Sequence, residues 1–201
     1  MRLDTHVHTS PGSRCSVMGI AAYLEAIAKQ GLTAACVTNH GDMADYRLLA
    51  DVAPAGLVLI PGVEISSETG DFLIYSTDFD FLSSLSAIQK LPPRSQRPAQ
   101  CVVIWAHPFA GVSERDVFEE FTDGVAAQVD AVEVYNGNWP DEEASVRARR
   151  IAARFGLAET GGSDAHRRED LLRCYTELEG IGSAADLIEA ISCRMTRAIS
   201  L

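Results

Sequence analysis

The sequence alternates short, almost uninterrupted apolar segments with segments of helical periodicity, and this alternation limits the fold more than any other feature. The segments expected to form strands are Arg2–Val7, Ala34–Asn39, Val58–Ile65, Phe72–Ser76, Val102–Ala106, Ala131–Tyr135, Leu157–Thr160 and an eighth candidate, Cys174–Leu178. Because their apolar runs are continuous, both faces of most strands are expected to be buried. Strand and helix alternate at about 25–30 residues per unit, which predicts right-handed crossovers and a parallel sheet or barrel.

Helical periodicity and capping residues occur between these strands. The expected helices are Ser16–Gln30, Met43–Ala53, Phe81–Leu91, Ser113–Phe121, Asp141–Phe155 and Ser183–Arg194. The chain therefore predicts an α/β fold. We expect residues 1–201 to form a single domain, because one domain usually takes roughly 100–200 residues.

Charge and cysteine content exclude several classes of protein. The chain has 17 Lys and Arg against 28 Asp and Glu, a formal net charge of −11. Such a surface repels phosphate backbones and anionic lipid, so we expect no nonspecific nucleic-acid binding and no membrane partner. The five cysteines are widely spaced without a C-x-x-C motif, which is typical of reduced thiols and predicts a cytoplasmic protein. No apolar run approaches the ~18 residues of a membrane span.

All five histidines stand at or just past the carboxyl end of a predicted strand. They are His6, His8, His40, His107 and His166. Two acids share these positions, because Glu64 ends one strand and Asp164 follows another. In parallel α/β folds the loops at this end converge on active sites. A single buried histidine is more often a hydrogen-bonded core residue, but the joint placement favours a metal site.

The spacing within two of these segments has a geometric consequence. Residues i and i+2 of an extended chain point to the same face, so His6 and His8 can reach one cation. Asp164 and His166 repeat this spacing. Imidazole combined with carboxylate suits Zn, Mn or Fe, whereas sites made only of oxygen suit Mg or Ca.

The order of these motifs resembles the PHP family, named for polymerase and histidinol phosphatase. The strings that carry the resemblance are His6-Val-His8, Thr38-Asn-His40, Pro61-Gly-Val-Glu64, His107-Pro108 and Ser163-Asp164-Ala-His166. It extends from residue 1 to about residue 168 of the chain. The resemblance implies a distorted (β/α)7 barrel of the PHP type. It also implies two to three divalent transition-metal ions (Zn, Mn or Fe) at the carboxyl ends of the strands.

The resemblance also implies roles for individual residues. His6, His8, Glu64 and Asp164 would hold one metal, and Glu64 would bridge to a second metal that also takes His107. His40 and His166 would serve a third metal or contact the phosphate. This chain departs from the usual pattern at two ligand positions. Asp71 stands where members often have a histidine, and the first loop offers Arg14 and Cys15 where an Asp or His is common.

These residues predict a metal-dependent phosphoesterase that hydrolyses a small-molecule phosphate ester, with a monoester favoured. A metal-activated water would attack phosphorus, and His40 or His166 would protonate the leaving oxygen. Arg14 and Arg167 belong to the site loops and could bind the phosphate. The arginines of Asp141–Phe155 are expected to form a solvated face.

Two alternatives stay open at this point. An amidohydrolase-like C–N hydrolase is disfavoured because Lys29 and Lys90, the only lysines, both fall in helical segments and offer no evident carbamylation site. A non-catalytic metal-binding PHP module is disfavoured because the set of acids and imidazoles is intact. The substrate, the monoester or diester preference, the metal and the oligomeric state do not follow from the sequence.

Overall fold

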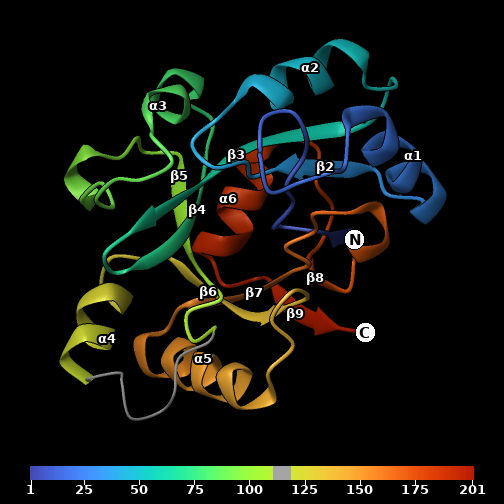
Figure 1. Ribbon diagram of the computed structural model, residues 1–201. Helices are drawn as coiled ribbons and strands as arrows, with labels where there is room; N and C mark the ends of the chain where they lie inside the picture. Colours follow the sequence, from blue (N-terminus) through green and yellow to red (C-terminus); the bar gives the residue numbers. More distant parts are fainter. Residues whose placement is uncertain (111–118) are drawn as a thin grey trace.

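The computed structural model describes residues 1–110 and 119–201, and it contains a curled six-stranded sheet beside a smaller three-stranded one (Figure 1). The strands are β1 (Arg2–Leu3), β2 (Ala34–Val37), β3 (Val58–Ser67), β4 (Gly70–Ser76), β5 (Cys101–Ala106), β6 (Ala131–Asn136), β7 (Ala158–Gly162), β8 (Cys174–Glu177) and β9 (Arg197–Ser200). The larger sheet has the order β2-β3-β4-β5-β6-β7 and the smaller one β1-β8-β9. The predicted α/β barrel type is confirmed, in the form of a half-barrel sheet.

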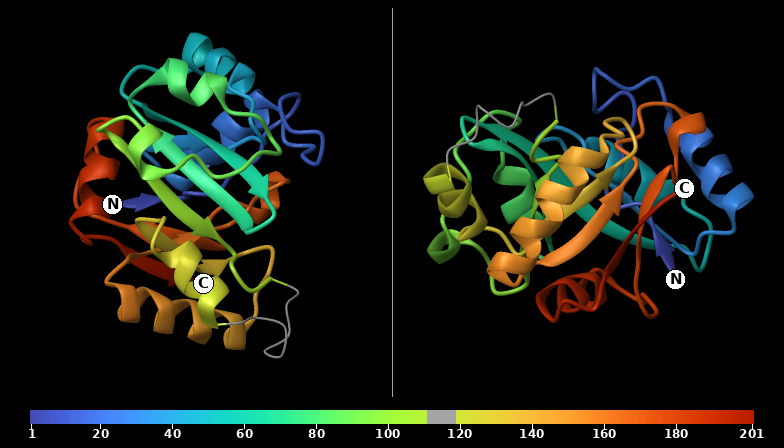
Figure 2. Two further views of the ribbon diagram at one scale, coloured as in Figure 1. Left: turned by 90° about the vertical axis from the view of Figure 1, so that its left-hand side faces the viewer. Right: turned by 90° about the horizontal axis from the view of Figure 1, so that it is seen from below.

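Helices cover the outside of the curl, as Figure 2 shows from two directions. They are α1 (Ile20–Gln30), α2 (Ala44–Val52), α3 (Phe79–Ser84), α4 (Glu119–Ala126) and α5 (Glu142–Phe155), whereas α6 (Ala184–Ser192) lies inside the curl. Asp141 caps α5 by accepting hydrogen bonds from the Glu143 and Ala144 amides, and Ser183 forms a capping box with Asp186 on α6. The helix expected at Ser113–Phe121 lies mostly outside the described residues.

The middle of the large sheet is antiparallel, which differs from the expectation of parallel crossovers throughout. β4 pairs antiparallel with both β3 and β5, whereas β2–β3, β5–β6 and β6–β7 are parallel. The reason is the length of the connection. Only Glu68 and Thr69 separate β3 from β4, and a parallel crossover needs about a dozen residues or more.

Three further elements differ from the expected boundaries, and a fourth was not expected. The first strand ends at Leu3, and the segment after it makes only an isolated bridge, between Val7 and Ala165. α1 begins at Ile20 because the Ser16 hydroxyl donates to the His8 carbonyl and accepts from the Met18 amide, which holds this stretch in a loop. α3 ends at Ser84, and β9 has no counterpart among the expected strands.

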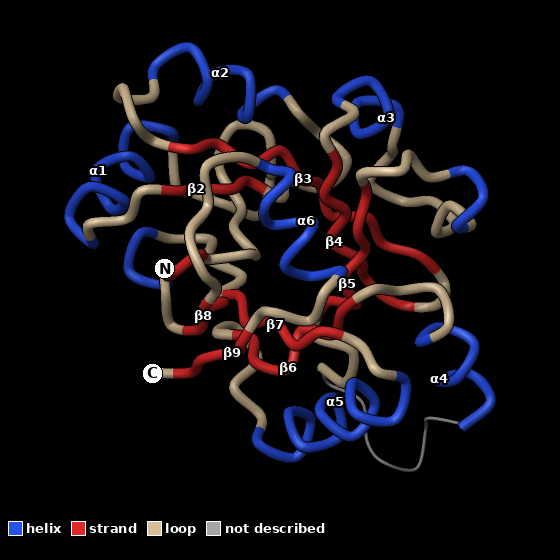
Figure 3. Tube along the Cα trace, turned by 180° about the vertical axis from the view of Figure 1, so that it is seen from behind, coloured by secondary structure: helices blue, strands red, loops and turns tan. Residues whose placement is uncertain are grey.

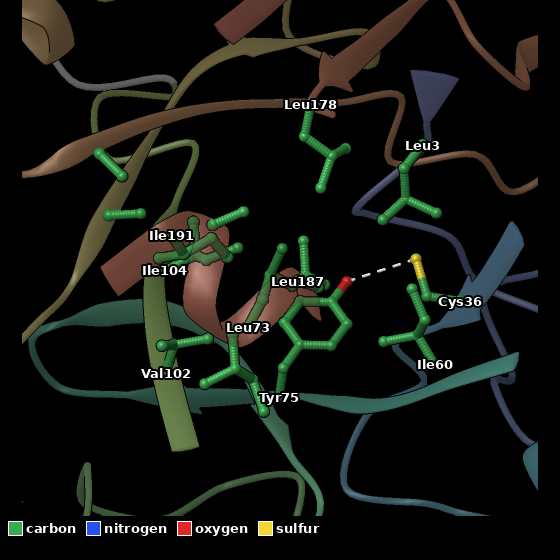
Figure 4. Packing of buried hydrophobic residues seen from close by; sticks show 14 of the residues in the cluster. Leu3, Cys36, Ile60, Leu73, Tyr75, Val102, Ile104, Leu178, Leu187 and Ile191 are labelled. Atoms are coloured by element: carbon green, nitrogen blue, oxygen red, sulfur yellow. Dashed lines mark hydrogen bonds between the residues drawn. The ribbon is translucent and has the colours of Figure 1, made fainter. Parts of the chain in front are cut away.

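The concave face of the sheet holds the largest part of the core. Alternate residues of the strands point inward, and α6 lies inside the curl and packs against them (Figures 3 and 4). This cluster includes Leu3, Cys36, Ile60, Leu73, Tyr75, Val102 and Ile104 from the strands and their neighbours, and Leu187 and Ile191 from α6. The intervening residues of the same strands face the outer helices. Both strand faces are therefore buried, as the continuous apolar runs predict.

The inward-facing positions change from apolar to polar along β3 and β4. On β3 the inward row runs from Ile60 through Gly62 to Glu64. Gly62 leaves room for a neighbour, because a Cβ there would lie 2.6 Å from Cε1 of Tyr75. The apolar core with α6 thus fills one end of the curl, and polar residues occupy the other.

No helix among the described residues is long and apolar enough to cross a membrane. That residues 1–201 form one domain stays a prediction.

Tyr75 links this core to the segment after β1, and its hydroxyl makes a testable contribution. The fully buried hydroxyl donates a hydrogen bond to the Thr5 carbonyl, next to His6. Tyr75→Phe removes the donor and leaves a buried carbonyl short of a partner, so the free energy of unfolding should fall by about 1–3 kcal/mol. Urea denaturation measures this change. Tyr46→Phe on α2, whose hydroxyl bonds to no described residue, is the control, and equal effects of the two variants would contradict the assignment.

Candidate metal centre

The five histidines and three acids predicted as ligands gather at the polar end of the curl. His6 and His8 lie after β1, His40 after β2, Glu64 on β3, Asp71 on β4, His107 after β5, and Asp164 and His166 after β7. Most of them follow a strand's carboxyl end, as expected. Asp71 stands near the amino end of β4 and reaches the same edge because β4 is antiparallel to its neighbours.

The Glu64 carboxylate is the point on which the imidazoles converge. Its Oε1 lies 3.4 Å from His6 Nε2 and 3.5 Å from His107 Nε2. Its Oε2 lies 3.2 Å from His8 Nε2 and 3.1 Å from His40 Nδ1. Although Oε2 is buried, no described group gives it a well-aligned hydrogen bond. Ligand atoms arranged around a cation have this geometry.

A first group of donor atoms consists of His6, His8 and Asp164. Asp164 Oδ1 lies 3.5 Å from His6 Nε2 and 3.2 Å from His8 Nε2, and the two ring nitrogens are 3.1 Å apart. All three residues are buried. Burying a carboxylate and two facing nitrogen lone pairs costs free energy when no cation is bound, whereas a divalent ion can bind all three. These residues therefore fit the first predicted metal position.

Two further groups share residues with the first. Glu64, Asp71 and His107 offer atoms within 4.8 Å of one another, which matches the second predicted position and includes Asp71. His8, Cys15 and His166 form another group at the same limit, and His40 groups with His8 and Glu64. The His40 and His166 rings each stack on His8, with centroid distances of 4.7 and 4.6 Å.

The backbone is strained at two of these residues. His107 has φ = 26° and Asp164 has φ = 52°, values that residues with a Cβ seldom adopt. Each strained residue is held by a buried carboxylate nearby. The His107 amide donates to Glu133 Oε2, and the Ser163 amide next to Asp164 donates to Asp4 Oδ1. Such strain persists where the surroundings fix the geometry, commonly at functional sites.

The charges in the cluster shift one another's pKa values. Burial by itself would raise the pKa of Glu64 and Asp164, but the charge of His6 outweighs it and lowers both. Burial would lower the pKa of His6, yet the carboxylates of Asp164, Glu133 and Glu64 raise it well above its usual value. Burial lowers the pKa of His40. The carboxylates are therefore negatively charged and attract a positive charge, whether a proton or a metal ion.

The predicted phosphate-binding arginines lie at the rim. Arg14 is exposed in the first loop, next to Ser13, whose hydroxyl lies 3.3 Å from His8 Nδ1. Arg167 is exposed directly after His166. The Arg168 guanidinium lies 3.7 Å from a carboxylate oxygen of Glu25 and 3.8 Å from one of Glu169, so it pairs with these acids. Phosphate binding by Arg14 and Arg167 stays a prediction.

Three buried acids next to the ligands were not identified from the sequence. Glu133 contacts His6 and His107, and Asp4 accepts from the Ser163 and Leu172 amides. Burial raises the pKa of Asp4 to about 6. Asp45, the third of these acids, accepts hydrogen bonds from the first loop and from Asn39, which follows β2. The signal for Glu133 was available, because an acid inside the apolar run Ala131–Tyr135 must have a buried partner.

Asp45 fixes the first loop against the segment after β2. Its Oδ2 accepts hydrogen bonds from Thr9 Oγ1 at 2.8 Å, the Gly12 amide at 2.9 Å and Asn39 Nδ2 at 3.0 Å. Asn39 Oδ1 in turn accepts from the Thr9 amide. This network connects the loop that carries Arg14 to the strand end that carries His40.

Solved structures share this architecture. PsfC from Pseudomonas syringae is 23% identical, with a TM-score of 0.72, and the match covers 100% of this chain and 91% of that one. A second similar structure is a two-domain protein from Bacteroides vulgatus that contains a predicted PHP-like metal-dependent phosphoesterase. It is 19% identical, with a TM-score of 0.74, and the match covers 100% of this chain and 64% of that one. The chain has a PHP-type fold.

Other comparisons agree with the PHP type. A PHP-associated family model matches residues 142–196, and this match and the fold together support the PHP domain family. Endonuclease Q, solved with a DNA duplex carrying an abasic lesion, has the same fold at 16% identity and a TM-score of 0.69, over 96% of this chain and 56% of that one. No curated protein matches the sequence.

The central position of Glu64 in this PHP-type fold gives a prediction about metal content. Glu64→Gln keeps the size of the side chain but removes the charge shared by the converging imidazoles. Zinc or manganese bound per chain, measured by elemental analysis after desalting, should fall by at least about half. Glu68→Gln, an exposed change four residues further along, is the matched control. Unchanged metal content in Glu64→Gln would show that Glu64 is not a ligand.

Proposed function

We propose that the protein is a metal-dependent phosphoesterase that acts on a small-molecule phosphate ester, with monoesters favoured over diesters. The observation that carries the proposal is the convergence of four imidazoles on one buried carboxylate, flanked by Asp71 on one side and Asp164 on the other. The PHP-type fold supports phosphoester chemistry, because the similar structures include a predicted metal-dependent phosphoesterase and an endonuclease.

The residues divide between two metal positions that share Glu64. His6, His8 and Asp164 would hold the first ion with Glu64, and Asp71 and His107 would hold the second. A third position would take His166 and Cys15, with His40 close by. Divalent ions held there would lower the pKa of a water molecule and neutralise charge on the phosphoryl oxygens.

The side chains around these positions bind the substrate and move protons. His166, one quarter exposed, stands where a leaving ester oxygen can receive a proton, and His40, more than one third exposed, lies on the other side of His8. Either imidazole can act as the general acid when it does not ligate an ion at the third position. Arg14 and Arg167, on the two loops that border the site, would bind the phosphate oxygens.

A substrate screen separates this function from its alternatives. p-Nitrophenyl phosphate, its bis-ester, a single-stranded oligonucleotide and a panel of amides are each assayed with Mn²⁺ or Zn²⁺. We expect the monoester to be hydrolysed fastest, and the net charge of −11 disfavours the oligonucleotide. Hydrolysis of amides alone would instead establish a C–N hydrolase. Metal binding without hydrolysis of any substrate would indicate a non-catalytic module.

Arg14 allows the phosphate-binding role to be tested apart from metal binding. A guanidinium cannot ligate a metal but can bind phosphate oxygens through two hydrogen bonds. Arg14→Ala should leave the metal content unchanged and lower kcat/KM by about 100-fold, equivalent to ~2.7 kcal/mol. Arg14→Lys should restore only part of the activity. Arg168→Ala, whose guanidinium lies near Glu25 and Glu169, is the control. If Arg14→Ala behaves like this control, Arg14 does not bind the substrate.

A further inference from the structure

Glu133 is a buried carboxylate that the proposed chemistry leaves without a role. It lies on β6, and its side chain is 0% exposed. Its Oε1 is 3.1 Å from His6 Nδ1, and its Oε2 accepts hydrogen bonds from the His107 amide and from Asn136 Nδ2, both at 2.9 Å. The carboxylate therefore contacts two predicted metal ligands that belong to different metal positions.

The contact with His6 determines which ring nitrogen carries the proton. An ionised carboxylate only accepts hydrogen bonds, so the nitrogen that faces Glu133 must be protonated. That nitrogen is Nδ1, which leaves the lone pair on Nε2. His6 Nε2 is the atom that faces His8, Glu64 and Asp164, at 3.1, 3.4 and 3.5 Å.

We infer that Glu133 is a positioning residue that holds His6 as the Nδ1–H tautomer, with Nε2 free to bind a metal ion. This inference rests on the metal binding in the proposed function. Through the His107 amide, the same carboxylate also fixes the strained backbone at φ = 26° that carries the second position's histidine. One buried acid thus orients ligands on both sides of Glu64.

The alternative is that Glu133 is itself a ligand, because His6, His107 and Glu133 also offer donor atoms within 4.8 Å. The hydrogen bonds argue against it. Oε2 already accepts from two N–H groups, and the backbone amide of His107 cannot turn away or change its proton. Both lone pairs of Oε2 are therefore used by donors, whereas Glu64 Oε2 has no well-aligned donor.

Gly162 on β7 makes the close approach of His6 and Glu133 possible. A Cβ on Gly162 would lie 2.4 Å from the His6 Cβ and 2.5 Å from Glu133 Oε1. Any side chain there would separate the two residues or displace one of them. A glycine next to the Ser163-Asp164 segment thus provides the space that the hydrogen bond needs.

The variant Glu133→Gln tests the tautomer directly. The amide oxygen must take the Oε2 position, because the His107 amide and Asn136 both donate there. The amide NH₂ then takes the position of Oε1, which is 3.1 Å from His6 Nδ1 against 3.3 Å for Oε2. This arrangement favours Nδ1 as an acceptor, with the proton on Nε2, where it blocks the metal-binding atom. Zinc affinity, measured by competition with a chelator, should fall by about 10–100-fold. Glu159→Gln on β7, whose carboxylate lies 3.7 Å from Arg149, is the matched control and should keep the wild-type affinity.

The tautomer is read by long-range ¹H–¹⁵N NMR of ¹⁵N-histidine protein loaded with zinc. The wild type should show His6 bound through Nε2 with a proton on Nδ1, a measurement that needs no variant to fold. Glu133→Asp keeps an acceptor at a greater distance and should recover part of the affinity lost in Glu133→Gln. A purely structural role for Glu133 would lower the Tm without moving the His6 signals.

The outcomes are distinguishable from failure of the proposed function. A wild-type His6 protonated on Nε2, or a Glu133→Gln variant with wild-type zinc affinity, overturns the inference. A wild type that binds no zinc overturns both the inference and the metal part of the proposed function. Zinc binding through His6 Nε2 without phosphate-ester hydrolysis supports the inference and contradicts only the proposed reaction.

Discussion

The burial of like charges beside Glu64 is the constraint on which this end of the molecule depends. Glu64, Asp164 and Glu133 are all nearly inaccessible to solvent, and the imidazoles around them lie 3.1–3.5 Å from carboxylate oxygens. Burying several carboxylates costs several kcal/mol per group unless positive charge compensates them. Protonated histidines can supply part of that charge, but then their ring nitrogens no longer serve as ligands. A divalent ion compensates the acids and leaves the imidazoles neutral, which fits every contact in the cluster.

The curled sheet makes this charge density possible because it separates two environments on one concave face. Inward residues of β3 and β4 are apolar where α6 packs and polar further along the same strand. The apolar side chains of α6 and Tyr75 lie directly next to the polar end of the concave face. The Tyr75 hydroxyl donates a hydrogen bond to the carbonyl of Thr5, next to His6. The same hydrophobic packing that stabilises the fold therefore excludes water from the underside of the site.

Much of this arrangement follows from the sequence, and the rest depends on contacts that span the chain. Strand ends are visible as breaks in apolar runs, so the common edge of the five histidines could be predicted. The antiparallel β4 follows from its two-residue link to β3, although the strand–helix alternation suggested crossovers. The position of α6 inside the curl is not encoded locally, because an amphipathic helix has the same pattern on either side of a sheet. Glu133 stands out as an acid in an apolar run, but the sequence does not identify its partner His6, which is 127 residues away.

In the proposed function, the acidity of the site would also set the order in which metal ions and the ester substrate bind. Glu64, Asp71, Asp164 and Glu133 bring four carboxylates to one end of a chain whose net charge is −11. In the metal-free site, protonated imidazoles would offset much of the carboxylate charge and leave no net positive charge for an anionic ester, and the exposed Arg14 and Arg167 add only two screened charges at the rim. Two divalent ions would contribute about four positive charges where the phosphoryl oxygens must lie. In the proposed function, a phosphate ester would therefore bind productively only after the cations, which the same acids would hold.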